Sequence, residues 1–362
     1  WTYYENIEID EKLTIIGNGS ANTIINGTWL DSNIIKISHE DVTVKNLKLV
    51  SGSNSTSELY GLLGIMSDNV ALDGLDVNGG YVGVKVDGDD VTILNTKVTG
   101  TSITLRGIEL GQSSNFVLHN STLSYNSYGL YSRSNALNIN IHNNSIHNNS
   151  VYGLQLESYG SIIRDNTIVD NEGWGILATG RTADDSDIMI INNTVLRNGN
   201  GIKVSRAEVQ FFTNTLVDNN GYGLFFYNSS NVYLWNNMIT ENDDVDLKIV
   251  TNSTENYAIG TTFSTISVDS TSSLIIKSYL DLDVNDASGN NMSGIDIKIM
   301  EDDVQKYATD YFGGSDSKTD SSGTIATFLI NSKKYDGSST PTAIPTYVTA
   351  RNHDWVETFT SD

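Results

Sequence analysis

The sequence predicts an all-β protein: a solenoid of short parallel strands, followed by a small antiparallel β-sandwich. Three observations indicate this fold class. Asparagine-rich triplets recur along the chain, a glycine follows each of them in a second strand-like run, and the pattern stops near residue 265. Short alternating segments that repeat at a regular interval are typical of proteins in which each repeat stacks on the next.

The repeat is clearest in residues 190–204, "IINNTVLRNGNGIKV", where two asparagines precede a short apolar run. The apolar residue that closes each triplet recurs in steps of 21 to 27 residues, and the glycine recurs with it. Leucine-rich repeats have a similar period, but their Leu-x-x-Leu-x-Leu frame is missing, and the 3.6-residue periodicity of helical repeats is missing too. The closing residues are Val77, Val98, Leu123, Ile146, Ile168, Val195, Leu216 and Ile239, and the glycines are Gly83, Gly107, Gly129, Gly153, Gly175, Gly201 and Gly223.

The asparagines are explained by the corners of such a solenoid. Each coil turns sharply between two strands, and asparagine tolerates the left-handed backbone conformation that such turns need. At about 4.8 Å per coil, stacked amides can hydrogen-bond along the axis, and about ten coils would make a rod of about 45–50 Å. We expect a ladder that begins at Thr96 and Ser121 and continues through Asn144, Asn166, Asn193, Asn214 and Asn237.

This pattern resembles the right-handed parallel β-helix repeat family, which includes pectate lyases and many Asn-rich surface proteins, particularly archaeal ones. The resemblance covers about residues 5 to 263. It implies a right-handed parallel β-helix over residues 1–265. The repeat identifies the fold but carries almost no information about activity.

A second unit is expected over residues 266–362. Here "SLIIKSYLDLDV" and "GIDIKIM" have the pattern of strands in an antiparallel sandwich. The turn "KTDSSGTIATF" at 318–328 resembles the Thr-Asp-x-x-Gly hairpin of carboxypeptidase-regulatory-like and Ig-like modules. The resemblance implies a β-sandwich of that type.

Composition excludes several partners. The 362 residues carry a net charge of −23, so nucleic acid and anionic membrane surfaces are poor partners. No apolar run approaches the ~20 residues of a membrane span. The absence of cysteine excludes disulfides and thiolate metal sites. The chain opens at Trp1 inside a strand-like pattern, as expected after removal of a leader, and we predict an extracellular or cell-surface location.

One outer face is predicted to be apolar. Residues three positions before each ladder amide should point inward, so their neighbours should point outward. Late in the rod, five large apolar side chains then share one outer sheet. The C-terminal sandwich or a loop would cover them, a second subunit or partner would contact them, or they would stack against sugars. They are Met189, Ile191, Phe212, Tyr233 and Trp235.

The outer surface also carries candidates for a catalytic site. The Gly-His-Gly, Asn-Thr-Asp, Arg-x-Pro-x-x-Arg and Asp-Pro-His-Glu motifs of polysaccharide-acting β-helix enzymes are absent. Four positions recur at 24- or 25-residue spacing after the glycine strands and should lie one above another: Arg133, Glu157, Arg181 and Ser205/Arg206. Together with the nearby aspartates they would stack carboxylates beside guanidinium groups. These residues form either an enzyme site or an exposed salt-bridge ladder. The catalytic candidates are Glu157, Arg181, Asp184, Asp185, Asp187 and Arg206.

Acidic clusters suggest calcium, because hard cations need several oxygen ligands from a compact loop. No cofactor is required by the sequence, and calcium is the ion we expect. The candidate ligands are Asp87, Asp89 and Asp90, and Asp243, Asp244 and Asp246.

Asn-x-Ser/Thr sequons are frequent, but chance alone yields nearly as many in a chain this rich in Asn, Ser and Thr. If the protein is exported by an archaeon or a eukaryote, sequons in loops or on outward positions are acceptor candidates. These are Asn26, Asn54, Asn143, Asn192, Asn228, Asn252 and Asn291.

The main functional prediction is an exported structural or adhesive surface protein, for example a filament, sheath or surface-layer subunit. Its expected partners are copies of itself or other surface proteins. The alternative is a polysaccharide lyase or hydrolase, or a protein that binds carbohydrate through Phe212, Tyr233 and Trp235.

Overall fold

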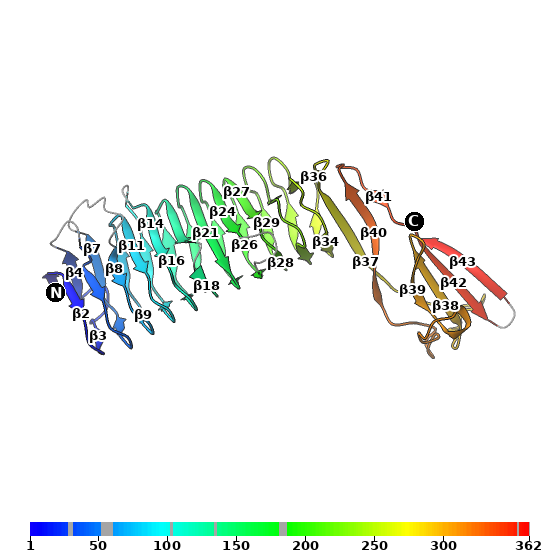
Figure 1. Ribbon diagram of the computed structural model, residues 1–362, viewed down its shortest axis with the longest axis horizontal. Coiled ribbons are helices and arrows are strands. Elements are labelled where there is room, and N and C mark those ends of the chain that lie inside the picture. The colour runs from blue at the N-terminus through cyan, green and yellow to red at the C-terminus, as the bar shows by residue number, and fades with distance from the viewer. Residues whose placement is uncertain are drawn as a thin grey trace.

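A computed structural model describes residues 1–27, 32–51, 61–101, 104–133, 136–180, 187–352 and 355–361. Apart from one 3₁₀ turn, every regular element within the described residues is a β-strand, which confirms the predicted fold class. Figure 1 shows a long rod of stacked strands that begins at the N-terminus and ends in a smaller antiparallel unit. The Arg181, Asp184, Asp185 and Asn54 candidates lie outside the described residues.

Three parallel sheets run along the rod, and each coil contributes one strand to each sheet. The first sheet contains β1 (Thr2–Tyr4), β4 (Ile24–Gly27), β7 (Lys48–Ser51), β10 (Asp76–Asn78), β13 (Lys97–Thr99), β16 (Thr122–Ser124), β20 (Ser145–His147), β23 (Thr167–Val169), β26 (Thr194–Leu196), β29 (Thr215–Val217), β32 (Met238–Thr240) and β35 (Thr262–Phe263). Its 12 strands exceed the predicted number of about ten coils.

The second sheet contains β2 (Ile7–Ile9), β5 (Ile35–Ile37), β8 (Gly61–Ile65), β11 (Val82–Val86), β14 (Arg106–Leu110), β17 (Tyr128–Ser132), β21 (Tyr152–Tyr159), β24 (Trp174–Thr179), β27 (Asn200–Ser205), β30 (Leu224–Tyr227), β33 (Leu247–Val250) and β36 (Ile266–Val268), with β18 (Ala136–Leu137) beside β21. The third contains β3 (Thr14–Ile16), β6 (Thr43–Lys45), β9 (Ala71–Asp73), β12 (Thr92–Leu94), β15 (Val117–His119), β19 (Asn140–His142), β22 (Ile162–Arg164), β25 (Ile188–Ile191), β28 (Val209–Phe212), β31 (Tyr233–Trp235), β34 (Asn256–Ile259), β37 (Ser273–Leu280), β40 (Phe328–Asp336) and β41 (Thr342–Ala343).

The core is a continuous column of aliphatic side chains inside the three sheets. Side chains alternate in and out along each strand, so one residue of every three-residue strand points to the core. In the third sheet the predicted inward residues are all buried: Ile93, Leu118, Ile141, Ile163, Ile190, Phe211 and Leu234. This confirms the predicted register.

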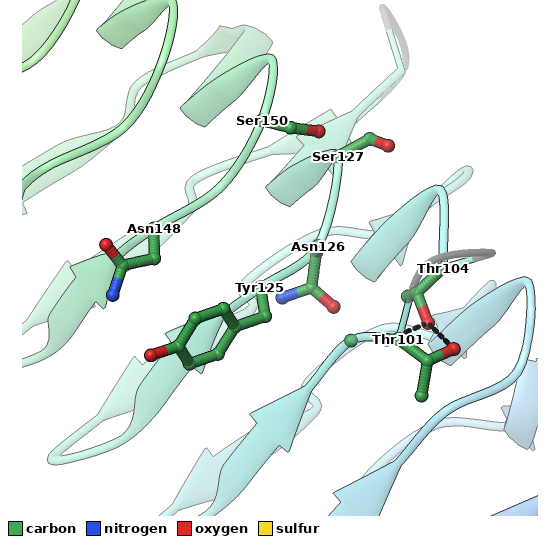
Figure 2. A pocket seen from close by; sticks show the side chains of 8 residues that line it. Thr101, Thr104, Tyr125, Asn126, Ser127, Asn148 and Ser150 are labelled. Carbon is green, nitrogen blue, oxygen red and sulfur yellow. Dashed lines mark hydrogen bonds between the residues drawn. The ribbon is translucent and has the colours of Figure 1, made fainter.

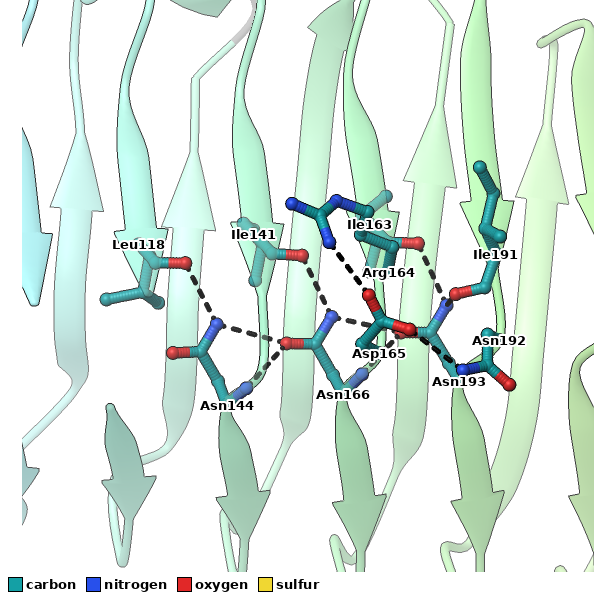
Figure 3. Close-up of polar contacts among 10 residues, drawn as sticks. All are labelled: Leu118, Ile141, Asn144, Ile163, Arg164, Asp165, Asn166, Ile191, Asn192 and Asn193. Atoms are coloured by element: carbon teal, nitrogen blue, oxygen red, sulfur yellow. Dashed lines mark hydrogen bonds and ion pairs between the residues drawn. The ribbon is translucent and has the colours of Figure 1, made fainter. Parts of the chain in front are cut away.

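The predicted amide ladder is present at the corner between the third and first sheets (Figure 3). The Nδ2 group of Asn144 donates to Oδ1 of Asn166 at 3.0 Å, and Asn166 donates to Asn193 at 2.9 Å. Each Oδ1 also accepts the backbone N–H of the ladder residue in the preceding coil. The ladder continues through Asn214 and Asn237, and Ser121 and Thr96 extend it toward the N-terminus as predicted.

The proposed reason for these asparagines was partly wrong. The left-handed residue is the one before each ladder position, such as Asn143 (φ 55°), Asp165 (φ 56°) and Asn192 (φ 51°). In each "Asn–Asn" pair the first residue therefore makes the turn, while the second forms the buried hydrogen bonds.

A second amide ladder, absent from the sequence prediction, lies at the corner between the first and second sheets. The first sheet contributes only three residues between its two corners, so every ladder residue has a counterpart five positions later. The second ladder ends on the buried carboxylate of Asp246. Its members are Asn126, Asn149, Asn171, Asn198, Asn219 and Asn242.

Parallel pairing continues to β36 and into β37, which then pairs antiparallel with β40. Beyond it lies an antiparallel sheet of four strands, β39 (Val304–Ala308), β38 (Asp296–Glu301), β42 (Thr346–Asn352) and β43 (Trp355–Ser361), with the 3₁₀ turn η1 (Asp310–Phe312). It has its own small core around Ile297, Ile299 and Val348. Figure 1 shows this unit past the end of the rod.

Candidate functional site

The outer surface of the second sheet carries a continuous set of aromatic and charged side chains. Its strands have up to eight residues, against two to four in the first sheet, so each coil presents more outward positions. Parallel register places Arg106, Tyr128, Tyr152, Trp174 and Asn200 in one column. The adjoining column contains Lys85, Glu109, Tyr131, Gln155, Leu177, Lys203, Phe225 and Lys248.

We name six ring-bearing residues of this surface the aromatic face. Five belong to the two columns, Tyr128, Tyr131, Tyr152, Trp174 and Phe225. The sixth, Tyr222, lies just before β30 and stacks on Trp174. All six are half-buried, so they lean on one another while keeping an exposed edge. Tyr128 meets Tyr152 edge to face at 5.6 Å, and Trp174 stacks on Tyr222 at 6.4 Å with an angle of 16°. Such contacts hold aromatic rings in fixed positions. The face is therefore a preformed surface.

Repeated glycines allow the coils to approach closely at the edge of this face. Tyr128, Tyr152, Trp174 and Tyr222 each precede one of them. A Cβ atom on Gly153 would lie 2.6 Å from the carbonyl oxygen of Gly175 in the next coil. Only glycine fits at such a distance, so the aromatic residues before the glycines are brought to the regular coil spacing.

A buried carboxylate with two guanidinium groups lies at one end of the aromatic face. The Glu109 side chain has no exposed surface and accepts hydrogen bonds from Arg106 at 2.8 Å and from Arg133 at 2.7 and 2.9 Å. The hydrogen bond from Arg133 to Glu109 raises the pKa of the Arg133 guanidinium. Since both Glu109 oxygens accept hydrogen bonds, this carboxylate holds the two guanidinium groups in place. The Arg133 side chain is 52% exposed, so it can also contact a ligand.

Two lysines provide positive charge at the other end. The Lys248 ammonium lies 4.7 Å from the centre of the Tyr222 ring and donates to its hydroxyl at 3.0 Å. The Lys203 ammonium lies 5.5 Å from the Phe225 ring. In a chain with a net charge of −23, Lys203, Lys248 and Arg133 make this face a local concentration of positive charge.

The predicted column is present in part: Glu157 shares it with Arg133 and Ser205, whereas Arg206 does not. Glu157 is opposite Thr179, and Thr179 is opposite Ser205. Arg206 follows Ser205 with φ 52°, so it falls outside the column of Glu157. Asp187 is exposed and precedes β25. Differences in loop length between coils explain the discrepancy, because equal spacing in the sequence predicts equal position only inside the strands.

Asp87 and Glu157 are two acidic residues of one column, three coils apart, with Gly111 and Arg133 between them. At about 4.8 Å per coil their backbone positions are about 14 Å apart. The missing side chain of Gly111 leaves room for the Asp87 carboxylate, which reaches over Gly111 toward Glu157.

The predicted apolar face lies on the outer surface of the third sheet. Tyr233 keeps 41% of its surface exposed and stacks on Tyr257 at 5.1 Å. Met189, Ile191, Phe212 and Trp235 are half-buried. The C-terminal unit lies past the end of the rod rather than over these residues, so the predicted covering by that unit is wrong (Figure 1). Contact with a partner stays a prediction.

Calcium binding by the acidic clusters stays a prediction. Within the described parts of the chain, no three carboxylate or histidine side chains lie close enough to hold an ion. Asp246 is buried and accepts hydrogen bonds from Asn242, Ser264 and Thr265, while Asp243 and Asp244 are exposed. In the other cluster, Asp89 accepts the N–H of Ser114 and Asp90 accepts the amide of Asn115, and Asp87 is half-buried.

The sequon positions fall mostly at corners of the rod. Asn143, Asn192, Asn252 and Asn291 are exposed, Asn228 is half-buried with φ 48°, and Asn26 is half-buried with no hydrogen-bond partner for its Oδ1. Their glycosylation stays a prediction.

Comparison with known proteins agrees with this architecture. The profile of the family described as "Right handed beta helix region" matches residues 60–183 and 179–263, which together are more than half of the chain. The chain therefore belongs to the right-handed β-helix family. No curated protein sequence matches it. No helix within the described residues is long and apolar enough to cross a membrane.

Solved structures with the same fold share little sequence. The Agl-KA catalytic domain has 17% identity and a TM-score of 0.64, over 76% of this chain and 61% of that one. The chain thus spans less than two thirds of that domain. The periplasmic alginate epimerase AlgG has 15% identity and a TM-score of 0.59, over 75% of each chain. The Dettilon tailspike protein has 13% identity and a TM-score of 0.61, over 97% of this chain and 70% of that one.

These comparisons correct the main functional prediction. One of these structures is described as a catalytic domain and another as an alginate epimerase. A further similar structure is the A-module of the mannuronan C-5 epimerase AlgE4 of Azotobacter vinelandii, with 14% identity and a TM-score of 0.51 over 74% of this chain and 86% of that module. The prediction of a structural filament, sheath or surface-layer subunit is therefore wrong, and its polysaccharide-active alternative is favoured.

Proposed function

We propose that this chain is a carbohydrate-active β-helix protein that binds an extended acidic polysaccharide along the aromatic face. The observation that carries the proposal is a run of six half-buried rings along one sheet, five of them in strand register, with Arg133 at one end and Lys203 and Lys248 toward the other. Sugar rings present apolar C–H surfaces and hydroxyl groups. Exposed aromatic edges beside polar and charged groups bind that combination.

The charge of the face favours an acidic polymer. Arg133 can present a guanidinium N–H pair to a sugar carboxylate, a geometry that gives strong bidentate contacts. Lys203 and Lys248 supply point charges about three to five coils further along. A chain bound along the axis would contact both groups at once.

We also place the protein outside the cytoplasm, and the periplasmic location named for the similar AlgG structure supports this proposal. The turn at 318–328 supports a carboxypeptidase-regulatory-like or Ig-like C-terminal module. Archaeal origin, N-glycans and bound calcium remain proposals that rest on composition.

Binding is tested by affinity electrophoresis in gels that contain alginate, pectate or a neutral glucan. We expect an acidic polymer to retard the protein, and Trp174→Ala to weaken that binding by about tenfold or more, since aromatic anchors dominate such interfaces. Tyr257→Ala on the third sheet is the matched control and should bind like the wild type. No retardation by any polymer, or equal losses in both variants, would refute the proposal.

A second candidate is chain cleavage by the predicted site around Glu157, which lies in the column of Arg133 beside the aromatic face. Release of new chain ends from the bound polymer, abolished in Glu157→Gln with binding intact, would establish it. Unchanged turnover in that variant would exclude Glu157 from the chemistry.

A further inference from the structure

A polar pocket lies at the corner between the first and second sheets, beside the Tyr128 end of the aromatic face. Its volume is about 440 Å³, within the range of small-ligand sites. Its described lining is Gly100, Thr101, Thr104, Tyr125, Asn126, Ser127, Asn148 and Ser150. None of these side chains is charged, although the chain as a whole is strongly acidic. Figure 2 shows hydroxyl and amide groups from three neighbouring coils around one tyrosine ring.

The pocket forms where the second amide ladder stops. Elsewhere, each ladder amide oxygen accepts the backbone N–H of the equivalent residue in the coil before it. For Asn126 that residue is Thr101, but the Thr101 N–H donates to the Thr104 hydroxyl at 2.9 Å instead. The Asn126 Oδ1 atom is therefore buried without a partner, although the residue is only 2% exposed. Figure 2 shows this oxygen on the side of Thr101 and Thr104.

A buried acceptor without a donor is costly, and a ligand hydroxyl can remove that cost. The Thr101 and Thr104 hydroxyl oxygens are 3.5 Å apart, which is a long and weak contact. A hydroxyl group that enters between them can replace this contact and donate to Asn126 Oδ1. Ser127, Ser150 and Asn148 supply further donors and acceptors.

Tyr125 provides the apolar surface that the pocket otherwise lacks. Its side chain is 57% exposed, and its backbone is left-handed with φ 60°. At the equivalent corner of the next coil the left-handed residue is Asn148, which adopts this conformation more readily. A bulky aromatic residue in this conformation is an outlier, and such strain marks functional positions. The ring is held edge-on to His147 at 6.1 Å.

We infer that this pocket is a separate binding site for one or two neutral sugar units. The inference rests on the proposed function only for the class of ligand, because the site itself includes none of the aromatic face. Uncharged hydroxyl and amide groups around one exposed ring suit a neutral pyranose and offer no cation to a uronate. Together, the two sites would select a polymer that contains both neutral and acidic units.

The test is ligand-observed saturation-transfer NMR with maltose, cellobiose, mannobiose and digalacturonate as probes. The protein should be made in bacteria without N-glycans, because Asn148 begins a sequon in the pocket wall. We expect at least one neutral disaccharide to bind to the wild type and to Trp174→Ala alike. Its affinity should fall by at least about tenfold in Tyr125→Ala, while Tyr125→Phe keeps it.

Two further variants separate loss of binding from loss of folding. Thr104→Val should weaken the same probe, because it removes the hydroxyl that borders the unpartnered Asn126 oxygen. Tyr125→Asn should fold at least as stably as the wild type, so loss of binding there cannot be due to unfolding. The inference is overturned if no neutral probe binds, or if Tyr125→Ala leaves binding unchanged. Loss of binding in Trp174→Ala alone would assign the sugar to the aromatic face and would also overturn it.

Discussion

Two adjacent asparagines of identical chemistry should differ sharply in their contribution to stability. Asn193 is 1% exposed and belongs to the first ladder, while Asn192 is exposed and makes the turn at φ 51° (Figure 3). We compare Asn193→Ala with Asn192→Ala in the full chain. The two residues have the same side chain and are adjacent in the sequence, so the comparison tests the structural assignment directly.

The magnitudes follow from the hydrogen bonds. Asn193 donates to Ile163 O at 2.9 Å and to Asn214 Oδ1 at 3.0 Å, and accepts from the Asn166 N–H at 3.0 Å. Truncation leaves the buried Asn166 N–H without its acceptor, at about 1–3 kcal/mol, and removes further bonds of about 1 kcal/mol each. The expected loss in the free energy of unfolding is about 3–5 kcal/mol.

Asn192→Ala should lower the free energy of unfolding by less, and for a different physical reason. The hydrogen bond from Asn192 to Asp165 at 2.8 Å is exposed and contributes little. Alanine in the left-handed region costs about 1–2 kcal/mol, whereas glycine relieves that strain. Asn192→Ala should therefore lose about 1–2 kcal/mol, and Asn192→Gly should stay within about 0.5 kcal/mol of the wild type.

The measurement is equilibrium unfolding in urea, followed by far-UV circular dichroism, with the denaturant slope required to be the same in all variants. If Asn192→Ala and Asn193→Ala lower the free energy of unfolding equally, the assignment of Asn192 to the turn and Asn193 to the ladder is incorrect. If Asn193→Ala stays within about 1 kcal/mol of the wild type, the ladder does not stabilise the rod in the way described.

The other predictions concern charge. Glu109→Ala leaves Arg106 and Arg133 without their buried partner and should lower stability by about 3–5 kcal/mol in calorimetry, and an unchanged Tm would contradict the buried ion pair. For Asp269, burial alone would raise the pKa, but hydrogen bonds from Thr251, Ser272 and Thr271 outweigh it and lower the pKa to about 2. Because this folded-state pKa is below its ordinary value, the stability is present above about pH 4 and is lost between about pH 4 and 2. After solvent screening it should amount to about 1 kcal/mol, and Asp269→Asn should remove that pH dependence. Finally, raising NaCl from about 0.05 to about 0.5 M should weaken binding of acidic polysaccharide several-fold and leave the neutral disaccharide unaffected, as titration at both salt concentrations would show.

The interior of the rod could be predicted from the sequence because it depends on strict alternation. Within a three-residue strand, one residue fixes the orientation of the other two, so Ile163 and Ile190 had to be buried once Asn166 and Asn193 were placed in register. The same reasoning should have revealed the second ladder. Asn171 follows Asn166 by five residues, and Asn198 follows Asn193 by five, which is the length of one strand and one corner.

The candidate site was harder to predict because it depends on positions at the ends of strands. Equal spacing predicted either Ser205 or Arg206 in the column of Glu157. The register places Ser205 there, with Thr179 in the coil between them, and it leaves Arg206 outside the column. The aromatic face did have a sequence signal: an aromatic residue directly before the repeated glycine, as at Tyr152 and Trp174. The physical reason for the repeated glycine is the close approach of neighbouring coils, which the period of the sequence does not reveal.

The distribution of charge explains how an acidic protein can bind an acidic polymer at one place. A net charge of −23 repels polyanions over most of the surface. On the aromatic face, Glu109 is buried and paired, so it holds Arg106 and Arg133 in place without exposing a carboxylate to the ligand. Repulsion elsewhere and attraction here favour one binding orientation more strongly than attraction alone. Removing exposed carboxylates far from this face should therefore increase nonspecific binding of the polymer more than it increases binding at the face.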